Sequence, residues 1–339
     1  MKERRIVITG GLGFIGANLI EYWRKQYPND QLFNLDCRSY ASSDLAKSRF
    51  DGMPKYQFIP IDLRDRVSLY ATLRNIRPHG VIHLAAESHV CRSIEGPEKF
   101  TQSNVMGTQN LLDTFYKYRQ TDQSRFHLVS TDEVFGELPL DAPHERFTEE
   151  TPFDPKSPYA ASKAAAHYLV KAYAHTFDLN ATISSCTNNF GPYQHEEKLV
   201  AKTILRLIQG QPAQIYGTGQ HVRDWIYVGT HVKALDHIFH QADSQDFYLV
   251  GGENERTNLE IVHVIGNHLV NQGVIDLYDI EFANLRPTDD RRYAVDTSRL
   301  RALGFDARTD SETFTREMGR TVAWYLERTR QHPTFSLAV

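Results

Sequence analysis

The chain has 339 residues, with 38 Lys and Arg against 42 Asp and Glu, and its formal net charge is −4. That length predicts about two domains, and the mild negative balance excludes the basic face of a nucleic-acid-binding protein. No run approaches the ~18 apolar residues of a membrane span, and no signal-peptide pattern opens the chain. Cys37, Cys91 and Cys186 are odd in number and form no C-x-x-C pair, so we expect a reduced, cytoplasmic, soluble protein.

The first 190 residues alternate short apolar runs with longer helical patterns. Near-continuous apolar runs are typical of strands covered on both faces, and strand–helix repetition predicts an α/β fold with a Rossmann-type, doubly wound parallel sheet. We expect strands at 4–9, 31–36, 56–61, 80–85, 125–131 and 181–187, and helices at 14–27, 66–76, 97–118 and 156–177.

After residue 190 glycine-containing turns break the chain into short pieces. Helices are expected at 198–209, 230–241, 258–272 and 311–328. We therefore predict a Rossmann domain over 1–190, a smaller irregular α/β substrate domain over 191–330 packed over the strand ends, and a tail over 331–339. Some later segments are free to return to the sheet.

A glycine-rich segment follows the first predicted strand and opens the first predicted helix. Gly10, Gly13 and Gly16 lie in GGLGFIG, which from Gly11 reads G-x-G-x-x-G. Such glycines allow a tight turn and a close approach of the backbone to a pyrophosphate, which the helix N-terminus attracts. The position of the motif between strand and helix favours a dinucleotide site over a simple glycine turn.

Carboxylates close the next two predicted strands. Asp36 lies 20 residues after Gly16 and can accept hydrogen bonds from both ribose hydroxyls of an adenosine. This favours NAD over NADP, although the neighbouring Arg38 leaves NADP open. Asp62 can bind the adenine edge or serve only as a helix cap.

Tyr159 and Lys163 are four residues apart and share one face of a predicted helix. We expect the Lys163 ammonium and a nicotinamide cation to lower the pKa of the Tyr159 phenol towards working pH. The spacing alone arises by chance in a chain of this composition. Thr131 adds weight, because it closes the fifth predicted strand, where it can hydrogen-bond a substrate hydroxyl beside the tyrosine.

Two carboxyl groups, Asp132 and Glu133, come directly after Thr131. A plain alcohol dehydrogenase does not need them. Oxidation of one carbon acidifies the C–H bond beside it, so one carboxylate can remove that proton while the other, as an acid with a raised pKa, protonates a leaving hydroxyl. The pair therefore indicates a dehydratase, with a solvated acidic turn as the alternative.

These motifs belong to a collinear set that resembles the extended short-chain dehydrogenase/reductases, specifically the dTDP-glucose 4,6-dehydratases. The resemblance covers nearly the whole chain, and the Thr131-Asp132-Glu133 triplet is the mark of a 4,6-dehydratase in that family. Further matching segments are 83–89 (HLAAESH), 188–194 (NNFGPYQ), 197–199 (EKL), 223–225 (RDW) and 290–294 (DRRYA).

The resemblance implies a redox-assisted elimination on a nucleotide sugar. Tyr159, assisted by Lys163 and Thr131, would take the proton of the glucose 4-hydroxyl while hydride passes from C4 to NAD⁺. Glu133 would remove the C5 proton, and Asp132 would protonate the departing 6-hydroxyl. Return of the hydride to C6 would give a 4-keto-6-deoxy sugar and regenerate NAD, so the expected enzyme is a hydro-lyase.

The resemblance also implies two sets of binding residues and no metal site. The residues expected to contact NAD are Gly10, Gly13, Phe14, Ile15, Gly16, Asp36, Asp62, Leu63, Ala85, Ala86, Ser88, Tyr159, Lys163 and Asn189. Those expected to contact the sugar nucleotide are Glu87, Thr131, Asn188, Lys198, Leu199, Tyr216, Arg223, Asn254, Arg286 and Asp290. Lys198 and Arg223 suit phosphates, although a helix-start lysine and a surface salt bridge would also explain them.

By the same resemblance, the helices that follow Pro97 and Tyr159 would pair across a four-helix homodimer interface. The small side chains at 160, 161, 164 and 165, all alanine, allow close helix packing there, but they can equally pack inside one subunit.

Three departures from the family pattern leave the substrate base open. Glu196 and the pair Thr288-Asp289 lie in segments expected near the nucleotide, so UDP-glucose or UDP-N-acetylglucosamine stays an alternative substrate. A 4-epimerase or a non-catalytic NAD-binding protein would not need the acid pair, which argues against both. For Cys91, the third departure, we expect a small buried side chain rather than a reactive thiol.

Overall fold

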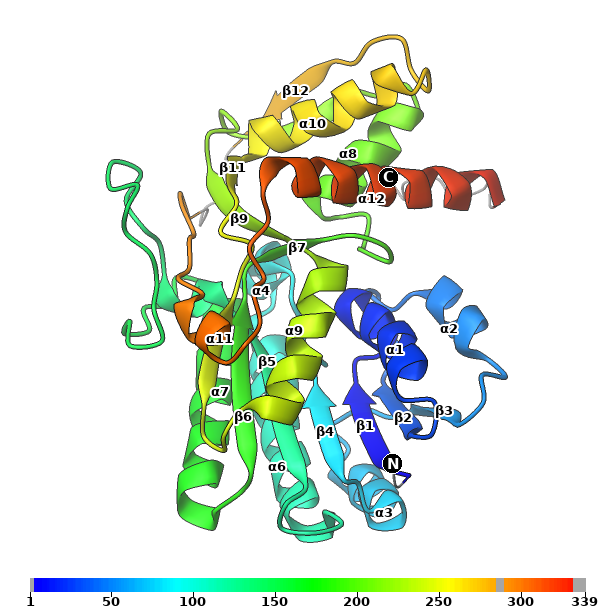
Figure 1. Cartoon of the computed structure of the whole chain (residues 1–339), viewed down its shortest axis with the longest axis vertical. Coiled ribbons are helices and arrows are strands. Elements are labelled where there is room, and N and C mark those ends of the chain that lie inside the picture. The colour runs from blue at the N-terminus through cyan, green and yellow to red at the C-terminus, as the bar shows by residue number, and fades with distance from the viewer. Residues whose placement is uncertain (1–2, 285–289, 332–339) are drawn as a thin grey trace.

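The structure is a computed structural model that describes residues 3–284 and 290–331. A seven-stranded sheet forms the lower part of the molecule in Figure 1, and all neighbouring strands in it run parallel in the order β10-β6-β5-β4-β1-β2-β3. Its strands are β1 (Arg5–Thr9), β2 (Gln31–Asp36), β3 (Tyr56–Pro60), β4 (Gly80–His83), β5 (Arg125–Thr131), β6 (Ala181–Cys186) and β10 (Phe247–Val250).

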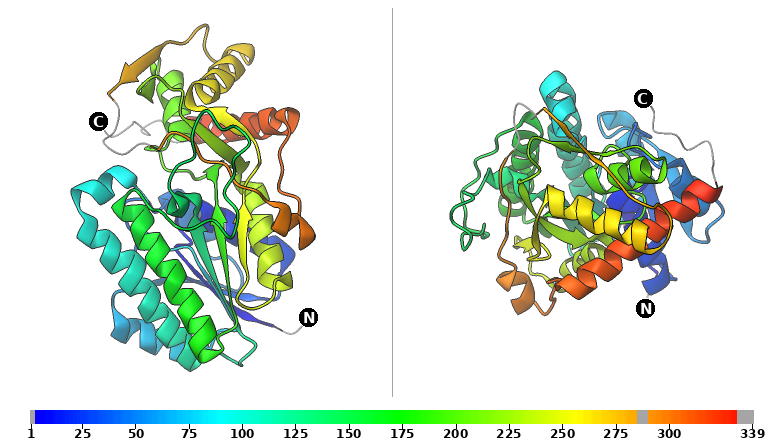
Figure 2. Two further views of the ribbon diagram at one scale, coloured as in Figure 1. Left: turned by 90° about the vertical axis from the view of Figure 1, so that its left-hand side faces the viewer. Right: turned by 90° about the horizontal axis from the view of Figure 1, so that it is seen from above.

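Helices cover both faces of this sheet because its central strands are apolar on both sides. Ile6 and Ile8 of β1 pack into a core with α1 (Phe14–Gln26) and α9 (Val228–Gln241). Val7 points the other way, into a core with α3 (Arg66–Ile76), α6 (Gly107–Tyr118) and α7 (Pro158–Phe177). Figure 2 shows α6 and α7 side by side as two long parallel rods on that face. This layering confirms the predicted Rossmann-type fold.

Short helical pieces complete the sheet-bearing region. They are α2 (Asp44–Phe50), α4 (Val90–Glu95), α5 (Pro97–Phe100), a π-helical turn (Thr101–Met106) that leads into α6, and a 3₁₀ turn (Asp132–Phe135) after β5. The prediction of one regular helix over 97–118 was therefore wrong in detail, because the π-helical turn interrupts it.

A smaller region lies over the carboxyl ends of the strands, at the top of Figure 1. It contains a three-stranded sheet of order β11-β9-β7 and the parallel pair β12-β8. Its elements are β7 (Asn188–Phe190), α8 (Leu199–Ile208), β8 (Ala213–Tyr216), β9 (Val222–Tyr227), β11 (Glu255–Thr257), α10 (Asn258–Asn271), β12 (Ile280–Ala283) and α12 (Ser311–Gln331), whereas α11 (Ser298–Ala302) packs beside β10 of the large sheet.

The chain passes between the two regions more than once. β10 returns to the edge of the large sheet beside β6, and α9 packs on α1. This return of later segments was left open by the sequence, and it means that residue 190 does not divide the molecule cleanly in space. No helix within the described residues combines the length and apolar character needed to cross a membrane.

Candidate active site

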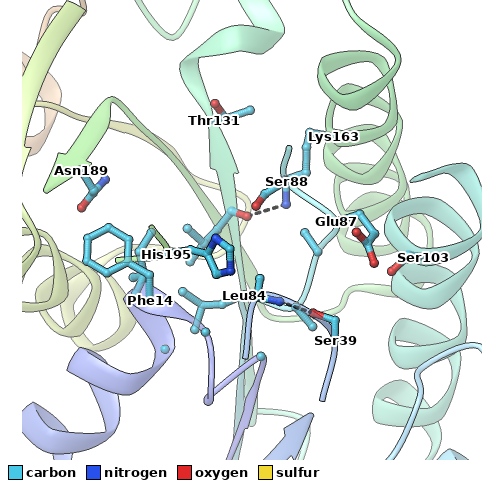
Figure 3. Close-up of a pocket in the computed structure, with 18 of the residues that line it drawn as sticks. Phe14, Ser39, Leu84, Glu87, Ser88, Ser103, Thr131, Lys163, Asn189 and His195 are labelled. Atoms are coloured by element: carbon cyan, nitrogen blue, oxygen red, sulfur yellow. Dashed lines mark hydrogen bonds between the residues drawn. The ribbon is translucent and has the colours of Figure 1, made fainter. Parts of the chain in front are cut away.

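A cavity of about 310 Å³ lies at the carboxyl ends of the sheet strands, where ligands bind in folds of this kind. Every residue predicted to contact NAD lines it, as do Glu87 and the catalytic candidates Thr131, Asp132 and Glu133. In Figure 3, Phe14 and Asn189 lie on one side of this cavity, and Glu87 and Ser103 lie on the other. The fold thus brings together segments from six strand ends.

The glycine turn at the floor of the cavity has room for backbone only. Gly10 has a φ of +70°, and a Cβ atom there would lie 2.8 Å from the backbone of Ala85. A Cβ at Gly16 would lie 2.2 Å from the Gly10 carbonyl oxygen. α1 begins directly afterwards, and its N-cap, Gly13, offers no side chain to its first amides. The exposed helix N-terminus therefore fits the pyrophosphate of a dinucleotide.

Asp36 is held rigidly at the end of β2. Its carboxylate accepts hydrogen bonds from the backbone amides of Leu12 (3.0 Å) and Arg38 (2.7 Å) and from the Ser42 hydroxyl (3.0 Å). The Arg38 guanidinium instead binds Asp44 at 3.0 Å on the surface. The carboxylate in the cavity fits a ribose with a free 2′-hydroxyl, and this arrangement favours NAD over NADP.

Asp62 also lines the cavity, but its carboxylate is already paired. It accepts hydrogen bonds from the backbone amide and the guanidinium of Arg64 at 2.9–3.0 Å, and these bonds lower the pKa of Asp62. The N-terminus of α3 is capped by Asp65, which accepts from the amides of Val67 and Ser68 at 3.1 Å. Asp62 is thus no helix cap, and its contact with adenine remains a prediction.

Tyr159, Lys163 and Thr131 meet where α7 crosses the end of β5. Ser157 caps α7 by accepting a hydrogen bond from the Ala160 amide at 3.1 Å, which sets where the helix begins. The Thr131 hydroxyl donates to Asp132 Oδ1 at 3.3 Å, and its interaction with the Tyr159 phenol lowers the pKa of Tyr159. Lys163 donates from Nζ to the Val129 carbonyl at 2.8 Å. All three predicted side chains are buried at the cavity wall.

The expected lowering of the pKa of Tyr159 by Lys163 and a nicotinamide cation stays a prediction, because the protein groups alone act in the opposite direction. Burial raises the pKa of Tyr159 well above its ordinary value, and the negative charge of Glu133 raises it further. Burial also lowers the pKa of Lys163 to about 8. Desolvation of a buried phenolate outweighs the effect of one buried ammonium, and sequence spacing carries no information on that burial.

Asp132 and Glu133 form the first half of the 3₁₀ turn after β5, and their environments differ. Asp132 is 2% exposed, and burial, followed by the charges of Glu133 and Asp224, raises the pKa of Asp132 well above its ordinary value. Glu133 is half-buried, and its backbone amide donates to the Thr131 hydroxyl at 3.3 Å. One group is therefore held as an acid next to a carboxylate that can act as a base, which is the division that an elimination requires.

A second cavity of about 180 Å³ adjoins the first, and the two share Glu133, Asn188, Glu197 and Lys198 in their walls. Most residues predicted to bind the sugar nucleotide line this second cavity: Asn188, Lys198, Leu199, Tyr216, Arg223 and Asp290. The Arg223 guanidinium lies 4.7 Å from the centre of the Tyr293 ring. The shared wall makes one continuous site, with Glu133 at the junction.

Two residues predicted to contact the substrate are not found in either cavity. Asn254 is buried and lines neither cavity, and its backbone amide donates to Asp224 of β9 at 2.9 Å, so its contact with substrate stays a prediction. Arg286 lies outside the described residues, as do Thr288 and Asp289.

The sequence missed several residues that shape the site. Glu197 faces His89 Nε2 at 3.5 Å and His195 Nδ1 at 3.7 Å, and Tyr293 lines the second cavity. Their places in the EKL and DRRYA segments were the available signal. Cys91, expected to be buried, is half-buried in α4, because one face of that short helix is open to solvent.

Comparison with known proteins places these motifs in a family. The model of the family described as GDP-mannose 4,6 dehydratase matches residues 7–318. A dTDP-glucose 4,6-dehydratase of Neisseria gonorrhoeae is 40% identical over 96% of this chain and 96% of its own length. One from Salmonella typhimurium is 37% identical over 96% of this chain and 94% of its own length.

Solved structures of related enzymes have the same fold as this chain. The dTDP-glucose 4,6-dehydratase of Streptomyces venezuelae, with NAD and TYD bound, has a TM-score of 0.87 and 34% identity, covering 97% of this chain and 99% of that one. The UDP-glucose 4-epimerase of Thermus thermophilus, in complex with NAD, has a TM-score of 0.84 and 27% identity, covering 95% and 99%. The chain therefore belongs to the dTDP-glucose 4,6-dehydratases, within the family that the GDP-mannose 4,6 dehydratase model describes.

Proposed function

We propose that this protein dehydrates dTDP-glucose to dTDP-4-keto-6-deoxyglucose with NAD as a cofactor that is regenerated in each turnover. The observation that carries the proposal is the Asp132–Glu133 pair beside Tyr159, with one carboxyl group buried and the other at the junction of two cavities. The similarity to dehydratases of known name supports the same conclusion.

Each residue of the site has a separate step in the reaction, set by its environment. NAD, when bound against the glycine turn and Asp36, would accept the hydride of C4 and return it to C6 after water has left. Tyr159 would receive the proton of the 4-hydroxyl as a phenolate, which Lys163 and the positive nicotinamide ring would have to stabilise against the effect of burial. The resulting ketone acidifies the C5 hydrogen, which Glu133 removes as a proton. Asp132 gives its proton to the 6-hydroxyl, which leaves as water.

The second cavity supports a nucleotide diphosphate next to this chemistry. Arg223 and Lys198 both line it, and a guanidinium and an ammonium are the side chains that best bind phosphate oxygens. Because Glu133 and Asn188 line both cavities, a sugar attached to that diphosphate would reach Tyr159.

We also propose that two copies pair through α6 and α7. Four large apolar side chains on these helices are 36–57% exposed: Met106 in the π-helical turn before α6, Tyr116 on α6, and Tyr168 and Phe177 on α7. Ala160 and Ala164 are buried within the subunit, which leaves Ala161 and the half-buried Ala165 to approach a partner. Sedimentation at micromolar concentration should give the mass of a dimer, and a monomer would reject this pairing.

The three free thiols are in keeping with a cytoplasmic location.

The alternatives are the same dehydration on another nucleotide sugar, such as UDP-glucose or UDP-N-acetylglucosamine, and a 4-epimerase. Mass spectrometry after incubation of the purified protein with dTDP-glucose and UDP-glucose separates them. We expect loss of one water from dTDP-glucose. Loss from UDP-glucose alone would reject the base assignment, and an unchanged mass with both would reject the dehydration of either.

A further inference from the structure

Lys202 of α8 and Gln214 of β8 form a hydrogen-bonded pair in the wall of the second cavity. Lys202 donates from Nζ to Gln214 Oε1 at 2.5 Å, and both residues are half-buried. Neither residue lines the first cavity, so neither takes part in the proton and hydride transfers. An ammonium and an amide held together in the wall of a ligand cavity are groups of the kind that fix the orientation of a ligand.

The lysine sets the direction of the Gln214 amide. An ammonium can only donate hydrogen bonds, so the amide atom that it contacts must be the carbonyl oxygen. The amino group at Nε2 is then the other end of the amide, and none of the residues that the structure describes accepts a hydrogen bond from it. A ligand that reaches this pair therefore meets N–H donors from both side chains.

The pair lies beyond the groups that suit phosphate. Lys198, the N-cap of α8, lines both cavities, whereas Lys202 lies about one turn further along the helix and lines only the second. In a nucleotide sugar the diphosphate separates the sugar from the nucleoside. With the sugar at the shared wall and the diphosphate at Lys198 and Arg223, the base would reach the part of the cavity formed by α8 and β8.

Tyr216 adds an aromatic ring to this part of the cavity. Gln214 and Tyr216 are two residues apart on β8, so their side chains lie on the same face of the strand, and both residues line the second cavity. The centre of the Tyr216 ring is 5.7 Å from Lys202 Nζ. A flat ring beside a set of donors suits a nucleic-acid base, which stacks through its face and forms hydrogen bonds along its edge.

We propose that Gln214, oriented by Lys202, recognises the base of the substrate, and that the pair selects thymine or uracil over cytosine. Thymine and uracil carry a carbonyl oxygen at their 4-position, which can accept hydrogen bonds from these donors. Cytosine carries an amino group there, which would face the two donors with a third. The inference rests on the proposed function, since it concerns the base of the same nucleotide-sugar substrate.

Binding of nucleoside diphosphates to the NAD-loaded protein tests the proposal without turnover. In calorimetric titrations, dTDP and UDP should each bind at least about tenfold more tightly than CDP, because donors that face donors stay unpaired. Equal or tighter binding of CDP would overturn the proposal. Tighter binding of UDP than of dTDP would support the donor pair and would move the proposed substrate to a uridine nucleotide.

Gln214→Glu keeps the shape of the side chain and an oxygen for Lys202, but it replaces the Nε2 donor by a second oxygen. The preference for dTDP over CDP should fall by at least about tenfold, and an unchanged preference would overturn the role of Gln214. Gln211→Glu is the matched control, because Gln211 is exposed and lines neither cavity. An equal fall in Gln211→Glu would also overturn the assignment to Gln214.

Lys202→Met separates recognition of the base from binding of the phosphates. If Lys202 orients Gln214, the affinity for dTDP should fall more than the affinity for CDP. Equal losses for both would mean that Lys202 binds the diphosphate that they share, and would overturn its part in the pair. The predicted preference in a protein that does not dehydrate dTDP-glucose would support the recognition of the base while rejecting the proposed function.

Discussion

Lys163 Nζ donates a 2.8 Å hydrogen bond to the carbonyl oxygen of Val129, two residues before Thr131 on the same strand. The bond joins α7 to β5, and it therefore fixes Tyr159, one turn earlier on α7, against Thr131. Because the ammonium is fully buried, its protonation state is coupled both to the chemistry and to the stability of the fold.

Replacing Lys163 by Met should reduce kcat by at least about 100-fold, because the proton path at Tyr159 loses its charged neighbour. The same substitution should also change how the free energy of unfolding depends on pH above pH 8. Folding lowers the pKa of Lys163 from 10.5 to about 8, so the unfolded chain binds more protons between those values. The free energy of unfolding of wild type, relative to Lys163→Met, should therefore rise between pH 8 and 10.5 by up to about 3 kcal/mol. Urea unfolding across that range tests this, and a pH-independent difference would contradict it.

Gly16→Ala should weaken NAD binding by at least about tenfold, since the new Cβ would lie 2.2 Å from the Gly10 carbonyl and displace the phosphate turn. Calorimetric titration of protein freed of bound nucleotide gives the affinity. Gly96→Ala is the control, because its nearest neighbour would be 3.9 Å away and its φ is −146°. Equal affinities for Gly16→Ala and wild type would show that the turn does not hold the cofactor.

Arg223→Met should raise KM for dTDP-glucose by about 10- to 100-fold, in line with the loss of one charge-assisted phosphate contact. The effect on kcat should be smaller, because the contact is made in both ground and transition states. Arg206→Met offers a comparison, since Arg206 lines neither cavity and donates from Nε to the Pro212 carbonyl at 2.7 Å. If Arg206→Met raises KM as much as Arg223→Met does, the phosphate role of Arg223 is wrong.

Six strands of the large sheet were predictable because they are continuous apolar runs with motifs at their ends, whereas β10 was not predicted and only the return of some later segment was left open. Asp36 and Thr131 close β2 and β5 as expected, and parallel strands place both at one edge. The short strands β7 and β11 were not foreseen. Each has three residues, too few for a period to show, and each exists only through its pairing with β9.

Burial was the property of the site that local sequence could not supply. The raised pKa of Tyr159 and the hydrogen bond from the Asn254 amide to Asp224 both depend on elements far away in the chain. Gly251 and Gly252 gave no sign of their neighbours either, because Asp224 approaches the first and the Trp225 carbonyl the second only after β9 and β10 are assembled. Motif spacing identifies the chemical groups, whereas tertiary packing sets their protonation.

The most direct measurement compares wild type with Glu133→Gln on dTDP-glucose in deuterated water. Wild type should release a product that has lost one water and carries solvent deuterium at C5, because the proton held by Glu133 exchanges with solvent. Glu133→Gln should lose at least about 100-fold in product formation. Glu137→Gln should retain activity, since Glu137 binds Arg291 on the surface outside both cavities. Unchanged turnover in Glu133→Gln, or a wild-type product without loss of water, would contradict the assignment of Glu133 and of the dehydration.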